Sequence, residues 1–293
     1  MPALTVTVIT YNEAASIRDT LQSVSWADEI IVIDSNSTDR TVEIAREYTS
    51  RVEVRDWAGY GPQKNYAASL ASHDWILSID ADERITPPLA DEIRAVMRTG
   101  PSAQAYSLPR VSFYLGRWIR STDWYPDFHV RLYDRRAARW TEQKVHESVR
   151  ATGRVEKLRG EMLHYPYRDM SEHLAKIDQY TTLVAEQWAA EGRRATALQA
   201  FIYPRLAFFR NYVLKRGFID GQTGLLVSLL NSYYVFLKYA KLIERQRHCS
   251  SLIPDPESLI PDPRFPIPDR DSQPRSADPG RAPHADQGPP GPP

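Results

Sequence analysis

Hydrophobic and polar residues alternate along the first hundred positions in blocks typical of strands and helices. Short apolar runs rich in β-branched residues predict strands at 4–10, 29–33, 51–54 and 74–79. The stretches between them predict helices at 13–24, from 37 to about 48, at 62–71 and at 89–97. Asn12 is a candidate N-cap of the first helix, and Ser37 and Thr38 of the second. Strands that alternate with helices at this spacing indicate βαβ units and a doubly wound sheet.

The pattern changes after residue 100. Short aromatic and β-branched runs at 106–108, 111–118, 128–133 and 144–149 predict a mixed-sheet extension. From Met170 onward we expect three helices, at 170–191, about 196–215 and about 220–244. Residues 250–293 hold more than half of the chain's 22 prolines. A segment of that composition cannot build a core, so we predict a disordered tail there.

The composition narrows the class of protein. Of the 293 residues, 42% are hydrophobic, enough to bury a core, so global disorder is excluded. Lys and Arg together equal Asp and Glu, and this balance gives no general attraction to nucleic acid. The single cysteine, Cys249, excludes an internal disulfide and a cysteine-based metal site, which fits a reducing compartment. The N-terminus predicts a buried strand instead of a signal peptide, and no apolar run has transmembrane length.

Acidic residues stand where two predicted strands end. Asp34 follows the strand at 29–33, and Asp80, Asp82 and Glu83 follow the strand at 74–79. Ligands of open α/β sheets bind outside the carboxyl ends of the strands. Asp80 and Asp82 point to the same side in extended geometry, so they predict a divalent cation between them, such as Mg²⁺ held by carboxylates and substrate phosphates. The alternative is a solvated turn before the helix at 89–97.

Four segments resemble the family-2 glycosyltransferases, which have a GT-A fold. They are Val8-Ile9-Thr10-Tyr11-Asn12-Glu13, Ile33-Asp34-Ser35-Asn36-Ser37-Thr38-Asp39, Gly61-Pro62-Gln63-Lys64-Asn65 and Asp80-Ala81-Asp82-Glu83. They cover about the first hundred residues in the family's order and spacing. The resemblance implies a Rossmann-like mixed sheet flanked by helices, with a C-terminal helical extension. From the resemblance together with the pattern along the chain, we expect a catalytic domain at 1–168 (nucleotide-sugar half 1–100, acceptor half 101–168), a membrane-proximal helical region at 169–249, and the disordered tail at 250–293, which is not part of the resemblance.

The resemblance also implies roles for single residues. It places Thr10, Tyr11 and Glu13 at the base and ribose of a nucleotide-sugar donor, Asp34 at the base or ribose, and Lys64 near the base or diphosphate. It makes Asp82 the ligand of a Mg²⁺ or Mn²⁺ ion that bridges the diphosphate, with Asp80 at the ribose or the metal. Where the family often carries Arg before Asn, this chain has Lys64, which keeps the charge without a bidentate fork.

A general base is needed on the face of the sugar opposite the leaving group, because the attacking hydroxyl loses a proton. In the strand-like segment 144–148, His146 and Glu147 point to opposite faces, and we prefer Glu147, since related family members carry Val-His-Glu here. Asp123, among aromatic neighbours that suit a sugar, is the rival. Glu147 has one structural alternative, a salt bridge to Arg131 or Lys144. His164 fits a metal ligand and a hydrogen-bonded core residue equally well.

The last helices combine apolar and basic residues. Residues 201–216 interleave aromatic and aliphatic side chains with four cations, and 217–247 carry a broad apolar arc that ends at Lys238, Lys241, Arg245 and Arg247. Such helices are typical of binding at an anionic membrane interface, although packing on the core or against a second copy of the chain would also use them. Two segments here, 215–221 and 233–241, resemble those of lipopolysaccharide inner-core β-1,4-glucosyltransferases.

These observations predict a metal-dependent, inverting glycosyltransferase, peripheral on the cytoplasmic face of a membrane. Its donor would be a nucleotide diphosphate sugar, UDP-linked glucose above all, and its acceptor a lipopolysaccharide-core or other lipid-linked glycan. One alternative is a transferase of the same fold that makes a polyprenyl-phosphate sugar or a soluble glycan. The other is a non-catalytic nucleotide-binding scaffold, which the intact acids at 34, 80, 82 and 147 disfavour.

Overall fold

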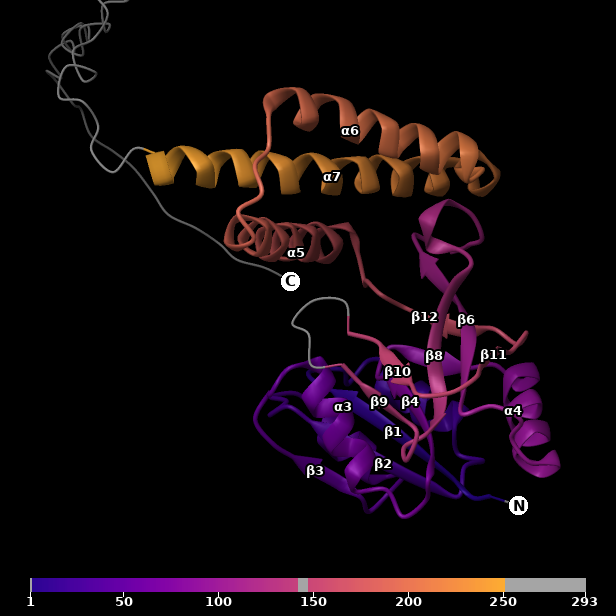
Figure 1. Ribbon diagram of the computed structural model, residues 1–293. Coiled ribbons are helices and arrows are strands. Elements are labelled where there is room, and N and C mark those ends of the chain that lie inside the picture. The colour runs from indigo at the N-terminus through magenta and orange to yellow at the C-terminus, as the bar shows by residue number, and fades with distance from the viewer. Residues whose placement is uncertain (1, 142–146, 251–293) are drawn as a thin grey trace, which may run out of the picture. The chain divides into compact units, whose positions relative to one another are not determined.

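A mixed β-sheet is the centre of the computed structural model, which describes residues 2–141 and 147–250 (Figure 1). Within the described residues, ten strands form this sheet along the order β3-β2-β1-β4-β8-β6-β12-β5, and β7 and β11 pair with β6. The strands are β1 (Leu4–Thr10), β2 (Glu29–Asp34), β3 (Val52–Val54), β4 (Trp75–Asp80), β5 (Glu83–Ile85), β6 (Ala105–Tyr114), β7 (Arg117–Ile119), β8 (Asp127–Asp134), β11 (Val155–Lys157) and β12 (Met162–His164). A separate ribbon pairs β9 (Ala138–Trp140) with β10 (Val149–Ala151).

Strand orientation in the sheet changes from parallel to antiparallel between the predicted nucleotide-sugar half (1–100) and acceptor half (101–168). Strands β1, β2, β3 and β4 are parallel, and β8 runs antiparallel to both β4 and β6. Every residue of β1 is buried, as expected for a strand covered on both faces. The expected doubly wound half with a mixed-sheet extension is therefore confirmed, and the four parallel strands end at one edge.

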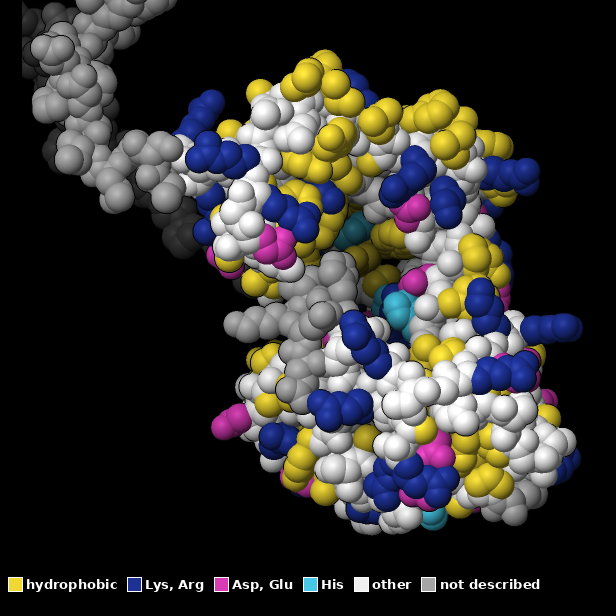
Figure 2. All heavy atoms as spheres, in the orientation of Figure 1, with side chains coloured by type: hydrophobic (Ala, Val, Ile, Leu, Met, Phe, Trp, Pro, Cys, Tyr) yellow, Lys and Arg dark blue, Asp and Glu magenta, His cyan; other side chains and the backbone are white. Residues whose placement is uncertain are grey.

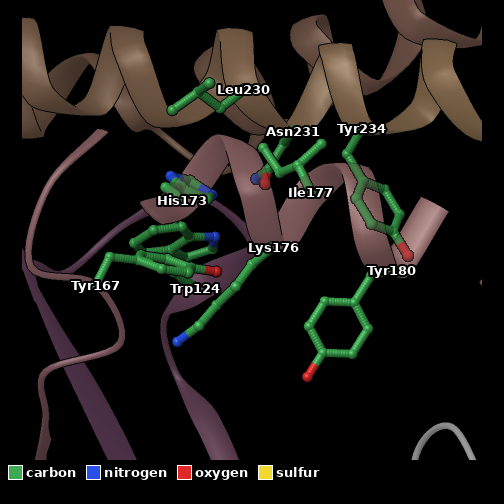
Figure 3. Close-up of a pocket in the computed structure, with 9 residues that line it drawn as sticks. All are labelled: Trp124, Tyr167, His173, Lys176, Ile177, Tyr180, Leu230, Asn231 and Tyr234. Carbon is green, nitrogen blue, oxygen red and sulfur yellow. The ribbon is translucent and has the colours of Figure 1, made fainter. Parts of the chain in front are cut away.

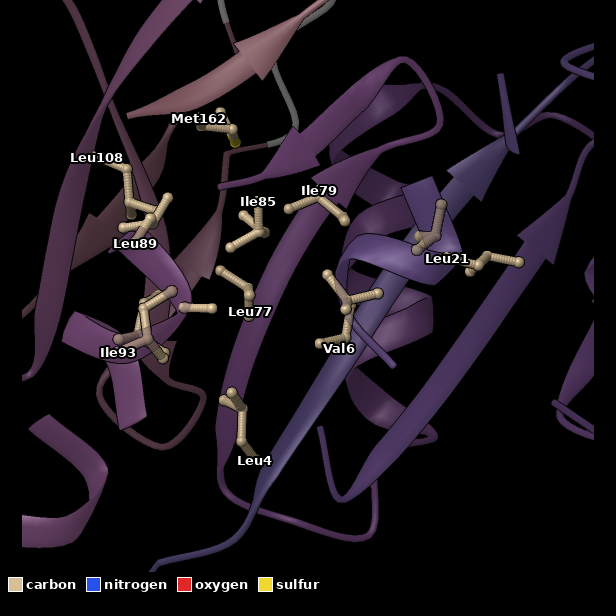
Figure 4. Packing of buried hydrophobic residues seen from close by; sticks show 14 of the residues in the cluster. Leu4, Val6, Leu21, Leu77, Ile79, Ile85, Leu89, Ile93, Leu108 and Met162 are labelled. Atoms are coloured by element: carbon tan, nitrogen blue, oxygen red, sulfur yellow. The ribbon is translucent and has the colours of Figure 1, made fainter. Parts of the chain in front are cut away.

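Helices cover both faces of the parallel half. Those of the first hundred residues are α1 (Ile17–Ser23), α2 (Thr41–Arg46), α3 (Tyr60–Ser69) and α4 (Pro87–Thr99). Leu21 of α1 and Leu89 and Ile93 of α4 join Val6, Leu77 and Ile79 of the strands in one core cluster (Figure 4). On the opposite face, Ala67 and Ala68 of α3 pack with Ile31, Ile33 and Ile76. Burying one large apolar side chain contributes about 1.5–3 kcal/mol, so these two layers hold the strand ends in place.

Two predicted helix starts are wrong, and for the same reason. Asn12 adopts a φ of 53° and does not cap a helix, because its side-chain oxygen accepts the Thr38 N–H at 2.8 Å. The helix that we expected from residue 37 begins at Thr41, since Ser37 bonds to Asp34 and to the Asn12 N–H. These polar side chains tie the loops after β1 and β2 to each other, and this loop contact replaces the expected caps.

The C-terminal helices pack on one another and on the extension of the sheet (Figure 1). They are α5 (Met170–Ala190), α6 (Ala197–Phe209) and α7 (Gly221–Ser250), with a π-helical turn η2 (Arg210–Leu214) and 3₁₀ turns η1 (Thr122–Trp124) and η3 (Gly217–Asp220). The Ser232 hydroxyl of α7 donates to the Pro204 carbonyl of α6. Asp220 accepts hydrogen bonds from the Arg120 N–H and the Ser121 hydroxyl. Residues 1–246 form one compact unit, and a domain boundary at residue 168 stays a prediction.

The basic residues at the end of α7, which we expected to face a membrane, contact α5. The Lys241 ammonium donates to Asp178 Oδ1 and Thr182 Oγ1 of α5, both at 2.7 Å. Arg245 donates to Glu186 of the same helix at 2.6 Å, and Lys238 lies over the Trp188 ring. The expectation that these cations face lipid phosphates is therefore wrong for Lys241 and Arg245, which join α7 to α5.

A large apolar surface is exposed elsewhere on these helices. Leu198, Phe201, Leu206 and Leu214 of α6 and η2 each expose more than half of their surface. Exposed Phe218, Ile219, Leu229, Tyr233 and Phe236 extend this surface over η3 and α7. Figure 2 shows hydrophobic side chains gathered over α6 and α7, with Lys and Arg beside them. We call these residues the apolar face. Among the described residues, no helix combines the length and the hydrophobicity that crossing a membrane requires.

Candidate active site

Three of the predicted site residues meet at the carboxyl ends of the parallel strands. Thr10 of β1 is the register partner of Asp34 on β2, and Ile9 is the partner of Asp80 on β4. The Thr10 hydroxyl is buried and has no hydrogen-bond partner among the described residues. Tyr11 follows directly and is exposed. This edge therefore presents both a buried polar atom that a ligand can satisfy and an aromatic ring open to solvent.

Asp34 organises the loop at this edge. Its side chain is fully buried, and it accepts the Ser37 N–H at 2.8 Å and the Ser37 hydroxyl. The backbone N–H of Glu13 donates to Thr41 Oγ1 at 2.8 Å, which fixes the neighbouring loop. A carboxylate has about four lone-pair positions, so the two bonds from Ser37 leave Asp34 further acceptor capacity.

Asp80 lies between two cations. Lys64 Nζ is 2.9 Å from Asp80 Oδ1, and an Arg131 Nη is 2.8 Å from Asp80 Oδ2. Burial alone would raise the pKa of Asp80, but the charges of Arg131 and Lys64 hold it well below its usual range. We predicted a divalent cation between Asp80 and Asp82, but residues distant in sequence, Lys64 and Arg131, supply the positive charges at Asp80.

Arg131 also connects Asp80 to a second group of ion pairs, which is centred on Glu83. Arg131 also contacts the fully buried Glu83 at 2.5 Å, and Arg110 contacts Glu83 at 3.2 Å and Asp127 at 2.6 Å. Burial would raise the pKa of Asp127, but His129 and Arg110 hold it below its usual range. Glu83 accepts the Asp80 N–H at 3.0 Å, so this network also fixes the backbone at the end of β4.

Asp82 has different surroundings from Asp80. Residues 81 and 82 form a turn between β4 and β5, so the extended geometry that would align the two carboxylates is not continued. Asp82 Oδ2 lies 3.5 Å from His164 Nε2, and the other ring nitrogen of His164 is 3.1 Å from Ser112 Oγ. His164 is thus hydrogen-bonded in the sheet and lies next to Asp82, and its role as a metal ligand stays a prediction.

Glu13 is an acid held near Asp82. Burial, followed by the negative charge of Asp82, raises the pKa of Glu13 to about 7. Two carboxyl groups in this proximity disfavour double ionisation unless a cation or a hydrogen-bond donor joins them. Lys176 of α5 opposes the rise, so α5 also reaches this region.

The two candidate bases occupy different places. Glu147 Oε1 is 3.7 Å from Lys64 Nζ, so the acceptor half approaches the strand edge here, and the salt bridge that we considered is made to Lys64. Asp123 lies in η1, where its carboxylate accepts from Arg210 and from Asn211 Nδ2 at 3.0 Å. Residues 144–146, half of the strand predicted at 144–149 and including Lys144 and His146, lie outside the described residues, and β10 begins at Val149.

The sequence of this chain matches a known protein family over the residues that build the site. The model of the family described as "Glycosyl transferase family 2" matches residues 5–154. These residues include the strand edge, the ion pairs of Asp80 and Glu83, and Glu147. The chain belongs to glycosyl transferase family 2. As a family-2 glycosyltransferase it is a transferase, and the α/β sheet with flanking helices is the GT-A fold that we predicted.

Relatives of this glycosyltransferase cover nearly the whole chain. An uncharacterised glycosyltransferase of Rickettsia felis is 29% identical over 270 residues, which are 88% of this chain and 95% of the relative. The lipopolysaccharide core biosynthesis glycosyltransferase LpsC of Rhizobium meliloti is 28% identical, over 83% of this chain and 92% of the relative. The solved structure of S. aureus TarS with UDP-GlcNAc is 14% identical, covers 84% and 92% of the two chains, and has a TM-score of 0.45.

The acidic side chains at this edge can bind a divalent ion only if phosphate oxygens of a substrate supply further ligands. Within residues 2–141 and 147–250, no group of three or more His, Cys, Asp or Glu side chains is arranged to hold a metal ion. Mg²⁺, however, usually keeps waters and takes one or two carboxylates plus substrate phosphates. Asp82, with Glu13 nearby and no Lys or Arg ion pair among the described residues, meets that requirement, whereas Asp80 is already neutralised.

Sequence reasoning identified Lys64 but missed the two arginines of the site. We considered Arg131 only as a partner of Glu147, and Arg110 and Trp140 had no assigned role. Lys64 Nζ lies 4.2 Å from the centre of the Trp140 ring, and Arg131 is stacked near the same ring at 5.5 Å. The available signal was a charged residue inside an apolar strand, Phe128–Tyr133, because an Arg buried there needs an acidic partner.

Proposed function

We propose that this glycosyltransferase moves a sugar from a nucleoside diphosphate to an acceptor hydroxyl with inversion, using Glu147 as the general base. The observation that carries the proposal is the row Asp80–Lys64–Glu147. Its two contacts, of 2.9 and 3.7 Å, bring a carboxylate of the acceptor half to the edge where the donor strands end. A single displacement needs a proton acceptor beside the attacking hydroxyl, and Glu147 is partly exposed there.

We propose that the nucleotide-sugar donor binds at the carboxyl ends of the parallel strands. The Thr10 hydroxyl, which is buried and has no partner in the part of the chain that the structure describes, binds the base and ribose of the nucleotide together with the exposed Tyr11 ring and Asp34. Lys64 and Arg131 hold Asp80 in a fixed, ionised state, in which it accepts from the ribose. Asp82, with His164 and Glu13 beside it, holds Mg²⁺ or Mn²⁺. The ion, when bound, neutralises charge that develops on the leaving diphosphate.

The acceptor is proposed to be a lipopolysaccharide-core or other lipid-linked glycan, with UDP-glucose as donor. Two features support this proposal: the likeness to LpsC over most of the chain and the apolar face on α6, η2, η3 and α7. Arg205 and Lys215 are exposed beside that face. A surface of this kind would place the protein at an anionic membrane on its cytoplasmic side. A soluble-glycan acceptor would leave the apolar face without a role unless a second copy of the chain covers it.

A donor screen tests the proposed function. UDP-glucose, UDP-N-acetylglucosamine, GDP-mannose and TDP-glucose are each incubated with the full chain, with lipopolysaccharide-core oligosaccharide and with or without Mn²⁺. We expect nucleoside diphosphate release from UDP-glucose, which depends on the metal and rises with the acceptor. Glu147→Gln is the inactive control. If no sugar nucleotide is consumed under any condition, the scaffold alternative replaces this proposal.

A further inference from the structure

A pocket with aromatic walls lies between α5, α7 and η1, outside the strand edge described above (Figure 3). Its volume is about 100 Å³. Ligand pockets for whole small molecules are usually about 300–1,000 Å³. This pocket therefore accommodates part of a larger ligand, on the scale of a single ring or a substituent.

One wall is a rigid aromatic stack. The rings of Tyr167 and His173 are parallel, with centres 4.0 Å apart, and Trp124 lies 6.1 Å from Tyr167. His173 Nδ1 is 2.8 Å from the Tyr114 hydroxyl. Burial, followed by the nearby Lys176, lowers the pKa of His173 to about 4, so this ring is neutral at physiological pH. The wall is thus apolar and uncharged, and it is fixed by a buried hydrogen bond.

The other wall is formed by two tyrosines, and a cation lies between the walls. Tyr180 of α5 and Tyr234 of α7 line the pocket, and Lys176 runs between Tyr180 and the Trp124–Tyr167 pair in the view of Figure 3. Lys176 Nζ is 2.8 Å from the Pro166 carbonyl and 3.4 Å from Glu172. An ammonium has three hydrogens to donate, and its side chain is partly exposed, so Lys176 can still meet an anion.

The pocket adjoins the proposed site of transfer. The centre of the Tyr60 ring lies 5.9 Å from Lys64 Nζ, which is 3.7 Å from Glu147 Oε1. Burial raises the pKa of Tyr60, and Tyr180 of the pocket, followed by Asp80 and Glu147, adds to this rise. Tyr60 is therefore near both the pocket residue Tyr180 and the proposed base. Lys176 in turn acts on Glu13, which is next to Asp82. A ligand in the pocket would accordingly extend toward Glu147.

We propose that this pocket binds a pyranose ring of the acceptor that carries an acidic group, a carboxylate or a phosphate. The apolar C–H face of the sugar packs on Tyr180 and the Trp124–Tyr167 wall, and its acidic group meets Lys176. Aromatic rings that combine an apolar body with a polar edge suit such a ligand. A charge-assisted contact to Lys176 selects acidic over neutral rings. This inference rests on the proposed function, because it assigns the pocket to the acceptor.

The test compares two probes that differ only at C6: methyl β-D-glucuronide and methyl β-D-glucoside. Their affinities for the full chain, with UDP and Mg²⁺ at saturation, are measured by ligand-observed saturation-transfer NMR. We expect the glucuronide to bind about tenfold more tightly, the effect of one hydrogen bond to a charged group. Lys176→Met, which keeps most of the aliphatic stem, should remove this preference. Tyr180→Ala should weaken both probes.

Lys157→Met is the matched control, because Lys157 also lies over an aromatic ring, that of Phe128, but outside the pocket. It should keep the preference for the glucuronide. UDP affinity, measured in parallel, should be unchanged in the Lys176 and Tyr180 variants. Equal binding of the two probes, binding of neither, or a preference that survives Lys176→Met overturns the inference. Loss of UDP affinity in Lys176→Met overturns it as well, since Lys176 would then serve the donor. Failure of the wild type to bind UDP would instead reject the proposed function.

Discussion

Lys64 Nζ lies 2.9 Å from Asp80 Oδ1 in an ion pair of which the lysine side chain is only 2% exposed. An ammonium buried this deeply needs acidic partners, and its next one is Glu147, at 3.7 Å. The aromatic ring of Trp140 covers its remaining side at 4.2 Å. Lys64 therefore connects the end of β4 with the segment before β10, and its role is structural before it is catalytic.

Replacing Lys64 by Met should destabilise the protein. Breaking a buried ion pair typically costs about 3–5 kcal/mol, and Asp80 would keep Arg131 at 2.8 Å, so we expect the free energy of unfolding to fall by about 3 kcal/mol. Urea denaturation followed by circular dichroism measures the change. Arg18→Met, which breaks the exposed pair between Arg18 and Glu47, is the control and should cost less than about 1 kcal/mol. Equal losses in the two variants would contradict the structural role of Lys64.

The sequence predicted most of the fold and the acidic residues of the site, but not its arginines. Strand β1 and helix α5 were recognisable because their apolar periodicity extends over many residues. Asp34 and Asp80 were recognisable because each follows an apolar strand. Arg131 was not, because its contact with Asp80 depends on the antiparallel register that pairs Leu77 with Leu132. A register between distant strands is a tertiary property, which periodicity alone does not specify.

Asp82→Asn should separate metal-dependent from metal-independent donor binding. An amide keeps the shape of the side chain but loses the charge that a hard divalent cation requires. By calorimetric titration we expect UDP to bind at least about tenfold more weakly in Mn²⁺, a loss of about 1.4 kcal/mol, and equally well in EDTA. Asp91→Asn on the exposed side of α4 is the control for loss of one negative charge. An unchanged affinity in Mn²⁺ would remove Asp82 from the metal site.

Glu147→Gln should lower turnover and spare donor binding. An amide cannot accept the proton of the attacking hydroxyl, and loss of a general base typically costs about a hundredfold or more in rate. Steady-state release of nucleoside diphosphate, with UDP affinity measured in parallel, checks both parts. Asp123→Asn is the informative comparison, because Asp123 already accepts from Arg210 and Asn211. An active Glu147→Gln enzyme beside an inactive Asp123→Asn enzyme would transfer the role of the base to Asp123.

Glu13 should make the metal-free protein less stable as the pH rises. Its pKa is about 7 in the folded chain, against 4.5 for the free side chain, so the folded state binds the proton more tightly. The contribution of Glu13 to stability is complete below pH 4.5 and is lost as the pH rises to about 7. Thermal unfolding in EDTA between pH 4.5 and 8 should show this decline in the wild type. Glu13→Gln, which has no proton to lose, should show a smaller one.

The apolar face should bind anionic membranes through residues other than those at the end of α7. Lys241 and Arg245 are engaged with α5, so reversing their charge would disturb helix packing instead of testing a membrane contact. Arg205 and Lys215 are exposed beside the apolar face and are the better test. A basic residue near an anionic surface contributes about 1 kcal/mol, so Arg205→Glu with Lys215→Glu should weaken binding by about thirtyfold or more.

Sedimentation with phosphatidylserine–phosphatidylcholine vesicles measures this binding. We expect the wild type to sediment at low salt and to be released in part at high salt, because ions screen the attraction of the cations but not the burial of the apolar side chains. Arg46→Glu with Arg98→Glu makes the same change of charge on α2 and α4, away from the apolar face, and should leave sedimentation unaltered. Leu206→Ser with Leu214→Ser should weaken binding at every salt concentration. If the wild type ignores the vesicles and equilibrium ultracentrifugation shows a dimer that the leucine variants dissociate, the apolar face binds a second copy of the chain, and a membrane-bound acceptor loses its structural support.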